Sequence, residues 1–208
     1  MEIDRRKRTL ILSVVFSALG PVATGVALTM NTSMTQFADF LRRSVELGVL
    51  VMALVVYVKL QNPSIAQAED DRLQRLMYRA SGAVLFFSSV VLGGLFVINV
   101  LRPGIPEGNV LLGLFVATLG LLFNAGFFIR YKLFDREKRH AIMDTQGKIY
   151  QAKTVVDLNV VIALSTIVFF PASTASYVVD VTGTAIIAVY MGIRGVLVFR
   201  KGRSSRST

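Results

Sequence analysis

Residues 80–101 read ASGAVLFFSSVVLGGLFVINVL, a stretch of apolar and small side chains that contains no charged residue. The hydrocarbon core of a bilayer is about 30 Å thick, and a helix needs about 20 residues to cross it. A helix also pairs its backbone N–H and C=O groups internally, as lipid requires. The stretch therefore predicts a membrane-spanning helix, and it sets the fold class of the chain.

Comparable apolar runs recur along the 208 residues, which are 53% hydrophobic with a mean hydropathy of +0.59. The segments between the runs are too short to bury a soluble core of ordinary size. We therefore expect an all-α polytopic membrane protein, in which residues 1–208 form a single six-helix transmembrane bundle with no soluble domain. The predicted spanning helices cover residues 10–30, 37–58, 80–101, 109–131, 149–170 and 176–199.

Lysine and arginine gather in alternate connecting segments. If the N-terminus is cytoplasmic, 18 of the 23 lie in cytoplasmic segments and Arg102 alone lies outside. The positive-inside rule then places both termini in the cytoplasm, with basic tails at residues 1–8 and 201–208 and the protein in the cell membrane. We attribute the net charge of +10 to this topology and to attraction by the lipid bilayer, and expect no nucleic-acid partner.

Two further patterns concern packing. Residues 70–79 are amphipathic and are expected to lie along the cytoplasmic interface before the third helix. Small residues recur in the third, fourth and sixth predicted helices, where they favour close helix approach. These glycines are Gly93, Gly94, Gly113, Gly120, Gly183 and Gly192.

The reactive side chains of an enzyme are scarce in this sequence. Cysteine is absent, which excludes disulfides, thiolate nucleophiles and thiolate metal sites. His140, the one histidine, forms an H-x-x-x-D pair with Asp144 that could bind a metal ion, but its basic surroundings favour a solvated loop residue. No nucleophile with a base is visible at membrane depth. We expect neither enzymatic activity nor a cofactor.

Two pairs of oppositely charged side chains stand inside two of the predicted spans. Arg42 and Glu46 are four residues apart in the second, and Lys153 and Asp157 repeat this spacing in the fifth. Residues at this spacing share one helix face, and Asp39 lies on the face of the first pair. Because a charge in hydrocarbon costs at least about 2.5 kcal/mol, these groups indicate a buried structural or transporting role.

The order of the charges predicts how the pairs meet. The second helix is expected to run inward and the fifth outward, which makes them antiparallel neighbours with Glu46 and Asp157 near mid-depth. Arg42 would then face Asp157, and Glu46 would face Lys153. We expect a four-charge cluster with no net charge.

The charges also lie within longer recognisable stretches. SMTQFADFLRRSVE at 33–46 combines an alanine-aspartate step with the first pair, and KTVVD at 153–157 contains the second. Asn124 precedes an Arg130-Tyr131 step, and Asp180 begins the sixth run. In order and spacing, over about residues 9 to 200, this set resembles the cation diffusion facilitator family. That family has His/Asp-x-x-x-Asp in its second helix and His-x-x-x-Asp in its fifth.

The resemblance implies export of a divalent cation such as zinc, iron, cobalt or manganese in exchange for protons, by a homodimer. We expect this chain to lack the cytoplasmic C-terminal domain of the family. The family's tetrahedral metal site falls on Arg42, Glu46, Lys153 and Asp157. Arginine has no lone pair to donate, and lysine must lose its proton before it binds metal. The family's site is therefore broken here, and Asp39, Glu46 and Asp157 are the plausible ligands left within the membrane.

Three hypotheses follow. The first is a cation transporter of this type, with proton coupling, whose altered ion pathway takes a proton or a hard cation such as magnesium, manganese or calcium. The second is a non-transporting relative whose charge cluster locks two helices and which binds a partner subunit as a homodimer or heterodimer. The third is an unrelated six-helix protein that carries another small or organic ion. The pathway residues of the first hypothesis are Asp39, Arg42, Glu46, Asn124, Lys153 and Asp157.

Overall fold

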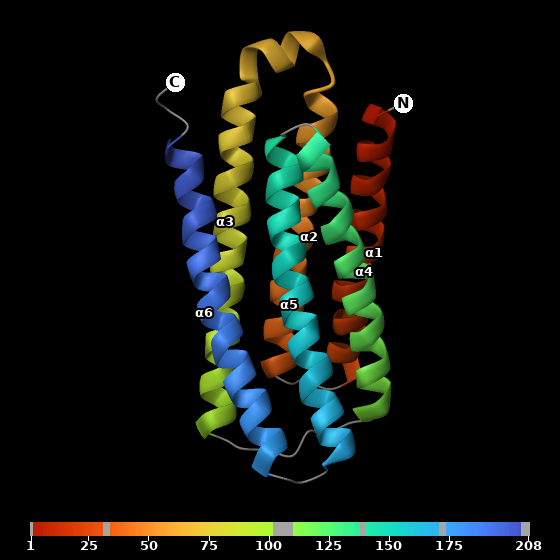
Figure 1. Ribbon diagram of the computed structural model, residues 1–208, viewed down its shortest axis with the longest axis vertical. Coiled ribbons are helices and arrows are strands. Elements are labelled where there is room, and N and C mark those ends of the chain that lie inside the picture. Colours follow the sequence, from red (N-terminus) through yellow and green to blue (C-terminus); the bar gives the residue numbers. More distant parts are fainter. Residues whose placement is uncertain (1, 31–33, 102–109, 138–139, 171–173, 205–208) are drawn as a thin grey trace.

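The computed structural model describes residues 2–30, 34–101, 110–137, 140–170 and 174–204. Over these residues the chain forms six helices and no strand. Figure 1 shows the helices side by side in one elongated bundle, in which α1 begins and α6 ends at the same end. The helices are α1 (Glu2–Met30), α2 (Met34–Lys59), α3 (Pro63–Leu101), α4 (Val110–Glu137), α5 (Ala141–Phe169) and α6 (Thr174–Ser204).

The helices cover the predicted apolar runs to within one residue and extend beyond most of them. Helix α1 starts at Glu2, so most of the expected basic tail at residues 1–8 forms its first turns. Arg6 is buried there, where its Nη2 donates to the Phe134 backbone oxygen at 3.2 Å and its guanidinium lies 5.8 Å from the Phe134 ring centroid. Helix α6 includes residues 201–204 of the second expected tail, and residues 205–208 lie outside the described part of the chain.

The segment at residues 70–79 does not form a separate interfacial helix. It is continuous with α3, whose first turns cross the end of the bundle in Figure 1 before the helix turns down beside α6. Met77 is fully buried and Leu73 packs against the same cluster of buried residues. Leu73 and Met77 thus pack on protein, whereas Leu76 of the same face is 45% exposed.

The most extensive helix contacts join α3 to α6, then α4 to α5 and α1 to α2. At the α3–α6 contact a Cβ atom on Gly82 would stand 2.5 Å from the Phe199 backbone nitrogen, and one on Gly195 would stand 2.6 Å from that of Phe86. The two backbones therefore touch. A Cβ on Gly93 or Gly94 would meet nothing within 4 Å, so the interpretation of these glycines as close-packing positions was wrong.

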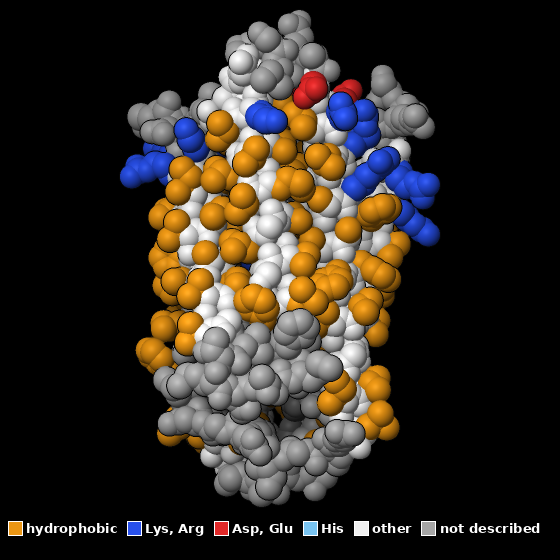
Figure 2. Space-filling view, turned by 180° about the vertical axis from the view of Figure 1, so that it is seen from behind, with side chains coloured by type: hydrophobic (Ala, Val, Ile, Leu, Met, Phe, Trp, Pro, Cys, Tyr) orange, Lys and Arg blue, Asp and Glu red, His pale blue; other side chains and the backbone are white. Residues whose placement is uncertain are grey.

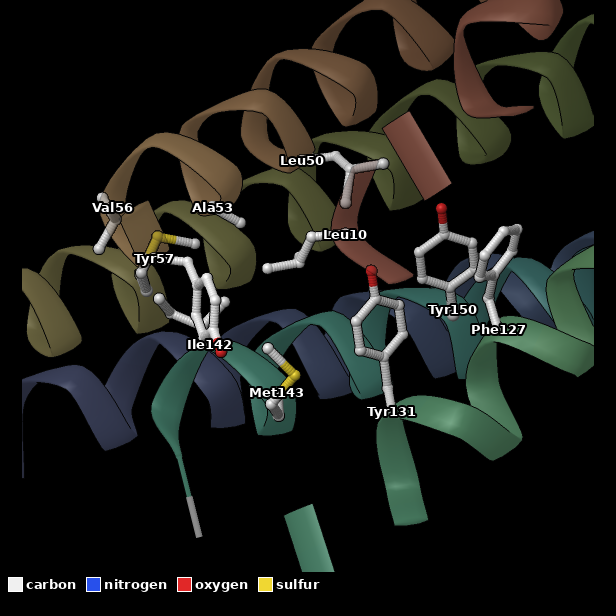
Figure 3. Packing of buried hydrophobic residues seen from close by; sticks show 11 residues of the cluster. Leu10, Leu50, Ala53, Val56, Tyr57, Phe127, Tyr131, Ile142, Met143 and Tyr150 are labelled. Atoms are coloured by element: carbon white, nitrogen blue, oxygen red, sulfur yellow. The ribbon is translucent and has the colours of Figure 1, made fainter. Parts of the chain in front are cut away.

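The buried core lies mainly among α1, α2, α4 and α5. Figure 3 shows this cluster, in which Leu10 of α1, Leu50 of α2, Tyr131 of α4 and Tyr150 of α5 have exposures of 0–2%. Helices α2 and α5 run in opposite directions, as predicted (Figure 1). A second cluster joins α5 to α3 and α6 through residues such as Ile149.

The outer surface is apolar over most of its length. In Figure 2 hydrophobic side chains cover the middle of the bundle, and the lysines and arginines in view gather toward one end. Three helical stretches in the described part of the chain are long and apolar enough to cross a membrane: Glu69–Ile98, Ala141–Phe169 and Tyr177–Arg203. Six spanning helices remain a prediction.

Candidate functional site

Glu46 lies at the junction of α2, α3 and α5. Its Oε1 accepts from Arg42 Nη1 at 3.2 Å, one turn away on α2, and from Ser88 Oγ of α3 at 3.1 Å. Its Oε2 lies 3.3 Å from Lys153 Nζ of α5. The Glu46 side chain is only 5% exposed, with Arg42 at 8% and Lys153 at 13%, so these charges interact away from bulk solvent.

Asp157 lies one turn beyond Lys153 on α5 and is held by a different helix. Its Oδ2 accepts a hydrogen bond from Asn124 Nδ2 of α4 at 2.6 Å. Gly120, one turn before Asn124, faces the same carboxylate, and a Cβ there would stand 3.5 Å from Oδ2. The structure therefore joins Asn124 and Asp157, the two candidate residues that connect α4 to α5.

The predicted pairing across α2 and α5 is half right. The pair of Glu46 with Lys153 is confirmed. Among the ion pairs of the described residues, Arg42 is joined to Glu46 and not to Asp157. Side chains four residues apart on a helix lie close together, so Arg42 reaches Glu46 along its own helix, while Asp157 is bound by Asn124. The cluster is thus a Glu46-centred group with Asp157 beside it.

The candidate residue Asp39 is in α2, but its side chain lies outside the described residues. Ser88 was not predicted, although it bonds the central carboxylate. It stands in the uncharged run that decides the fold, where a serine is common and carries no signal of its own. Only its three-dimensional proximity to Glu46 reveals it.

The chemistry of the cluster differs from that of a metal cage. Two basic side chains, Arg42 and Lys153, face one carboxylate, and guanidinium and ammonium groups have no lone pair to give to a metal. No group of three histidine, aspartate or glutamate side chains able to hold a metal ion occurs in the part of the chain that the structure describes. The arrangement instead provides one carboxylate with built-in counter-ions and a second carboxylate held by an amide.

The H-x-x-x-D pair does not converge on a shared site. His140 lies outside the helices, as predicted, and is partly exposed; it is the N-cap of α5, where its Nδ1 accepts from the Ile142 backbone nitrogen at 3.3 Å. Asp144 Oδ2 accepts from Tyr78 Oη of α3 at 2.7 Å and from Lys201 Nζ of α6 at 2.9 Å. Asp144 therefore ties α5 to the α3–α6 pair at the end of the bundle where α1 begins.

A family model for the cation efflux transmembrane domain matches residues 10–205. This chain belongs to that family. The match spans all six helices and includes Glu46, Lys153 and Asp157. Among curated proteins, none matches the sequence.

Membership of the cation efflux family makes the chain an integral membrane protein of a cation transporter family. It confirms the resemblance drawn from the second and fifth helices.

Proposed function

We propose that this cation efflux protein transports a hard cation through the Glu46-centred cluster, with Asp157 and Asn124 as the adjoining step of the pathway. The observation that carries the proposal is the ion pair of Lys153 with Glu46, which places a tethered cation against a carboxylate. The resemblance drawn from the sequence assigns both positions to the family's metal site. We place the protein in the cell membrane as a homodimer with both termini in the cytoplasm.

Lys153 gives the cluster a way to couple two ions. A substrate cation that binds Glu46 must displace the ammonium group 3.3 Å away or make it lose its proton. A nearby positive charge disfavours the protonated form of lysine, so substrate entry favours proton release. Proton return to Lys153 would then expel the substrate. This gives cation and proton exchange with a lysine in place of a family ligand.

The donor atoms set the substrate class. Glu46 and Asp157 offer carboxylate oxygens, and the amide of Asn124 uses its nitrogen to hold Asp157, which leaves its oxygen as a neutral ligand. Oxygen ligands suit magnesium, manganese and calcium better than zinc. Arg42 remains charged throughout, so it keeps a permanent counter-ion beside Glu46. We therefore expect selectivity for hard cations.

A non-transporting role is the second candidate, and a specific observation favours it. The Glu46 carboxylate already accepts from side chains of α2, α3 and α5, so the cluster could serve to lock these helices together. Buried ion clusters often add little stability but can fix helix register. In that case the protein would act as a membrane subunit that binds a partner.

Ion flux into liposomes separates the two candidates. Purified protein is reconstituted with an internal indicator for magnesium, manganese, calcium or zinc and with a pH-sensitive dye. We expect flux of a hard cation with opposite proton movement, abolished by Glu46→Gln. The matched control is Ser44→Ala on the same helix, whose hydroxyl bonds only along α2 to the Phe40 backbone oxygen at 2.8 Å. Absence of flux in the unsubstituted protein, or unchanged flux in Glu46→Gln, would exclude transport through the cluster.

A further inference from the structure

Gln146 of α5 is a buried amide without a protein partner. Its side chain is fully buried, and neither Nε2 nor Oε1 finds a hydrogen bond among the residues that the structure describes. An amide buried in this way costs a few kcal/mol unless something polar satisfies it. Gln146 is seven residues before Lys153, about two helical turns toward the end of the bundle where α1 begins.

Gln146 starts a polar stripe along α5. Gln146, Tyr150, Lys153 and Asp157 are spaced four, three and four residues apart, which places them on one face of the helix. The neighbouring face contains Ile149, Ala152 and Val156, which belong to an apolar cluster. The stripe leads from Gln146 to the proposed ion pathway.

Helix α1 provides further polar atoms opposite the stripe. Ser17 Oγ lies 2.8 Å from Tyr150 Oη, which in turn donates to the Ser13 backbone oxygen at 3.2 Å. Ser13 Oγ lies 2.6 Å from Tyr131 Oη of α4. Figure 3 shows the hydroxyl oxygens of Tyr131 and Tyr150 on the same side of the cluster. The ammonium of Lys153 lies 5.1 Å from the Tyr150 ring centroid, so these hydroxyls adjoin the Glu46-centred cluster.

The chemistry of these groups selects water over a bare metal ion. A water molecule can donate to Gln146 Oε1 and accept from Nε2, which satisfies both amide atoms. A dehydrated cation would bind the oxygen and be repelled by the amide N–H group. The stripe carries no carboxylate between Gln146 and Lys153, so a dication would pass without a counter-charge. Hydroxyls, an amide and water together can relay protons.

We propose that Gln146 marks a hydrated passage between α1 and α5 that leads from the end of the bundle where α1 begins to the Glu46-centred cluster and conducts protons. This inference rests on the proposed function for the use of those protons. The passage itself is a physical property of the protein and can be tested without any transport measurement.

Single-cysteine labelling tests the passage directly, because the chain has no cysteine of its own. Gln146→Cys is compared with Ala53→Cys on α2. Ala53 is also fully buried and lies seven residues from Glu46, so it stands at nearly the same depth as Gln146 in an antiparallel helix, but among apolar residues. Reconstituted protein is treated with a small water-soluble methanethiosulfonate reagent, which reacts with the thiolate.

We expect Gln146→Cys to be modified at least about tenfold faster than Ala53→Cys, since the reactive thiolate is scarce in dry apolar surroundings. Equal slow rates at the two positions would overturn the passage. If Gln146→Cys does not fold, Ser13→Cys on the α1 side of the passage takes its place, with Ala152→Cys on the apolar face of α5 as its buried control. Ser13→Cys is expected to react faster than Ala152→Cys, and equal rates would again overturn the passage.

A flux measurement then assigns the passage to protons. Gln146→Leu should slow proton movement in the reconstituted protein several-fold, and Gln146→Asn, which retains an amide, should restore part of it. Fast labelling of Gln146→Cys in a protein that shows no flux would remove the proposed function but support the passage. Proton movement unchanged in Gln146→Leu would overturn the proton role, whatever the effect of Glu46→Gln.

Discussion

At the scale of single residues, Glu46 is shared by two cations and a hydroxyl. Arg42 and Lys153 approach different oxygens of the same carboxylate, and Ser88 adds a hydrogen bond to Oε1. The stability of this group therefore depends more on Glu46 than on any one of its three partners. Loss of either cation leaves Glu46 a partner, whereas loss of the Glu46 charge leaves two cations without their shared anion.

This asymmetry predicts unequal effects on stability. Glu46→Gln should lower the free energy of unfolding by about 3–5 kcal/mol, the usual cost of stranding a buried charge. Lys153→Met should cost less, on the order of 1–3 kcal/mol, because Arg42 and Ser88 still bond Glu46. Thermal unfolding in detergent measures both. The double variant should lose less than the sum of the single losses, and strictly additive losses would contradict the pairing.

Zinc binding should be weak in the unsubstituted protein. Zinc requires about four unprotonated ligands, and two of the four positions that the resemblance assigns to the family's metal site are Arg42 and Lys153. Calorimetry at neutral pH should therefore detect no tight binding, while the double substitution Arg42→Asp and Lys153→His should introduce it. Micromolar binding by the unsubstituted protein that Asp157→Ala abolishes would contradict the prediction. It would show that Lys153 loses its proton to solvent and binds the metal through its neutral amine.

At the scale of helices, the sequence predicts which segments form helices better than it predicts which helices contact one another. Long apolar runs determine six helices because backbone pairing in lipid leaves no alternative, and the structure contains all six. The limits of the apolar runs are poor guides to the ends of the helices. Arg6 and Met77 lie in helical turns outside the apolar runs and are buried. An apolar run ends where the lipid contact ends, whereas a helix continues wherever a neighbour supports it.

Helix contacts were harder to infer because they depend on rotation about each axis. Gly82 and Gly195 make the close approach of α3 to α6, although the predicted positions in α3 were Gly93 and Gly94. All four are small residues in apolar helices, so composition cannot separate them. The same limit applies to the site. The charge spacing predicted that Glu46 meets Lys153, but the bond from Ser88 depends on how α3 is rotated.

The α3–α6 contact provides a matched test on one helix. Gly82→Ala would place a Cβ atom 2.5 Å from the Phe199 backbone nitrogen, so the helices must separate, at a cost of about 1–3 kcal/mol or more. Gly93→Ala meets open space and should be neutral or stabilising by up to about 1 kcal/mol, since alanine favours helix. Thermal unfolding in detergent compares the two. Equal stability of both variants would rule out the close backbone contact.

At the scale of the whole molecule, the orientation in the membrane can be checked. The basic segments predict that both termini face the cytoplasm. A cysteine introduced by Ser205→Cys would be the only thiol in the chain, so an impermeant thiol reagent should leave it unmodified in intact cells and modify it after permeabilisation. Modification of Ser205→Cys in intact cells would show that the orientation is the reverse of the predicted one. Arg102→Cys, which is expected outside, serves as the control and should be modified in intact cells.

The glycine contact between α3 and α6 has a mechanical consequence. Two helices whose backbones touch cannot slide independently, so α3 and α6 form one stiff body. Side-chain hydrogen bonds join this body to its neighbours: Ser88 to Glu46, Tyr78 and Lys201 to Asp144, and Arg194 to Gln151. These polar bonds act beside the apolar packing of α3 and α6 against α2 and α5, which includes Val49, Val84, Ile149 and Ile187. A thiol cross-linker between Tyr78→Cys and Asp144→Cys would clamp the stiff body at one end while leaving the Glu46 charges intact, and a protein that works by rocking would stall.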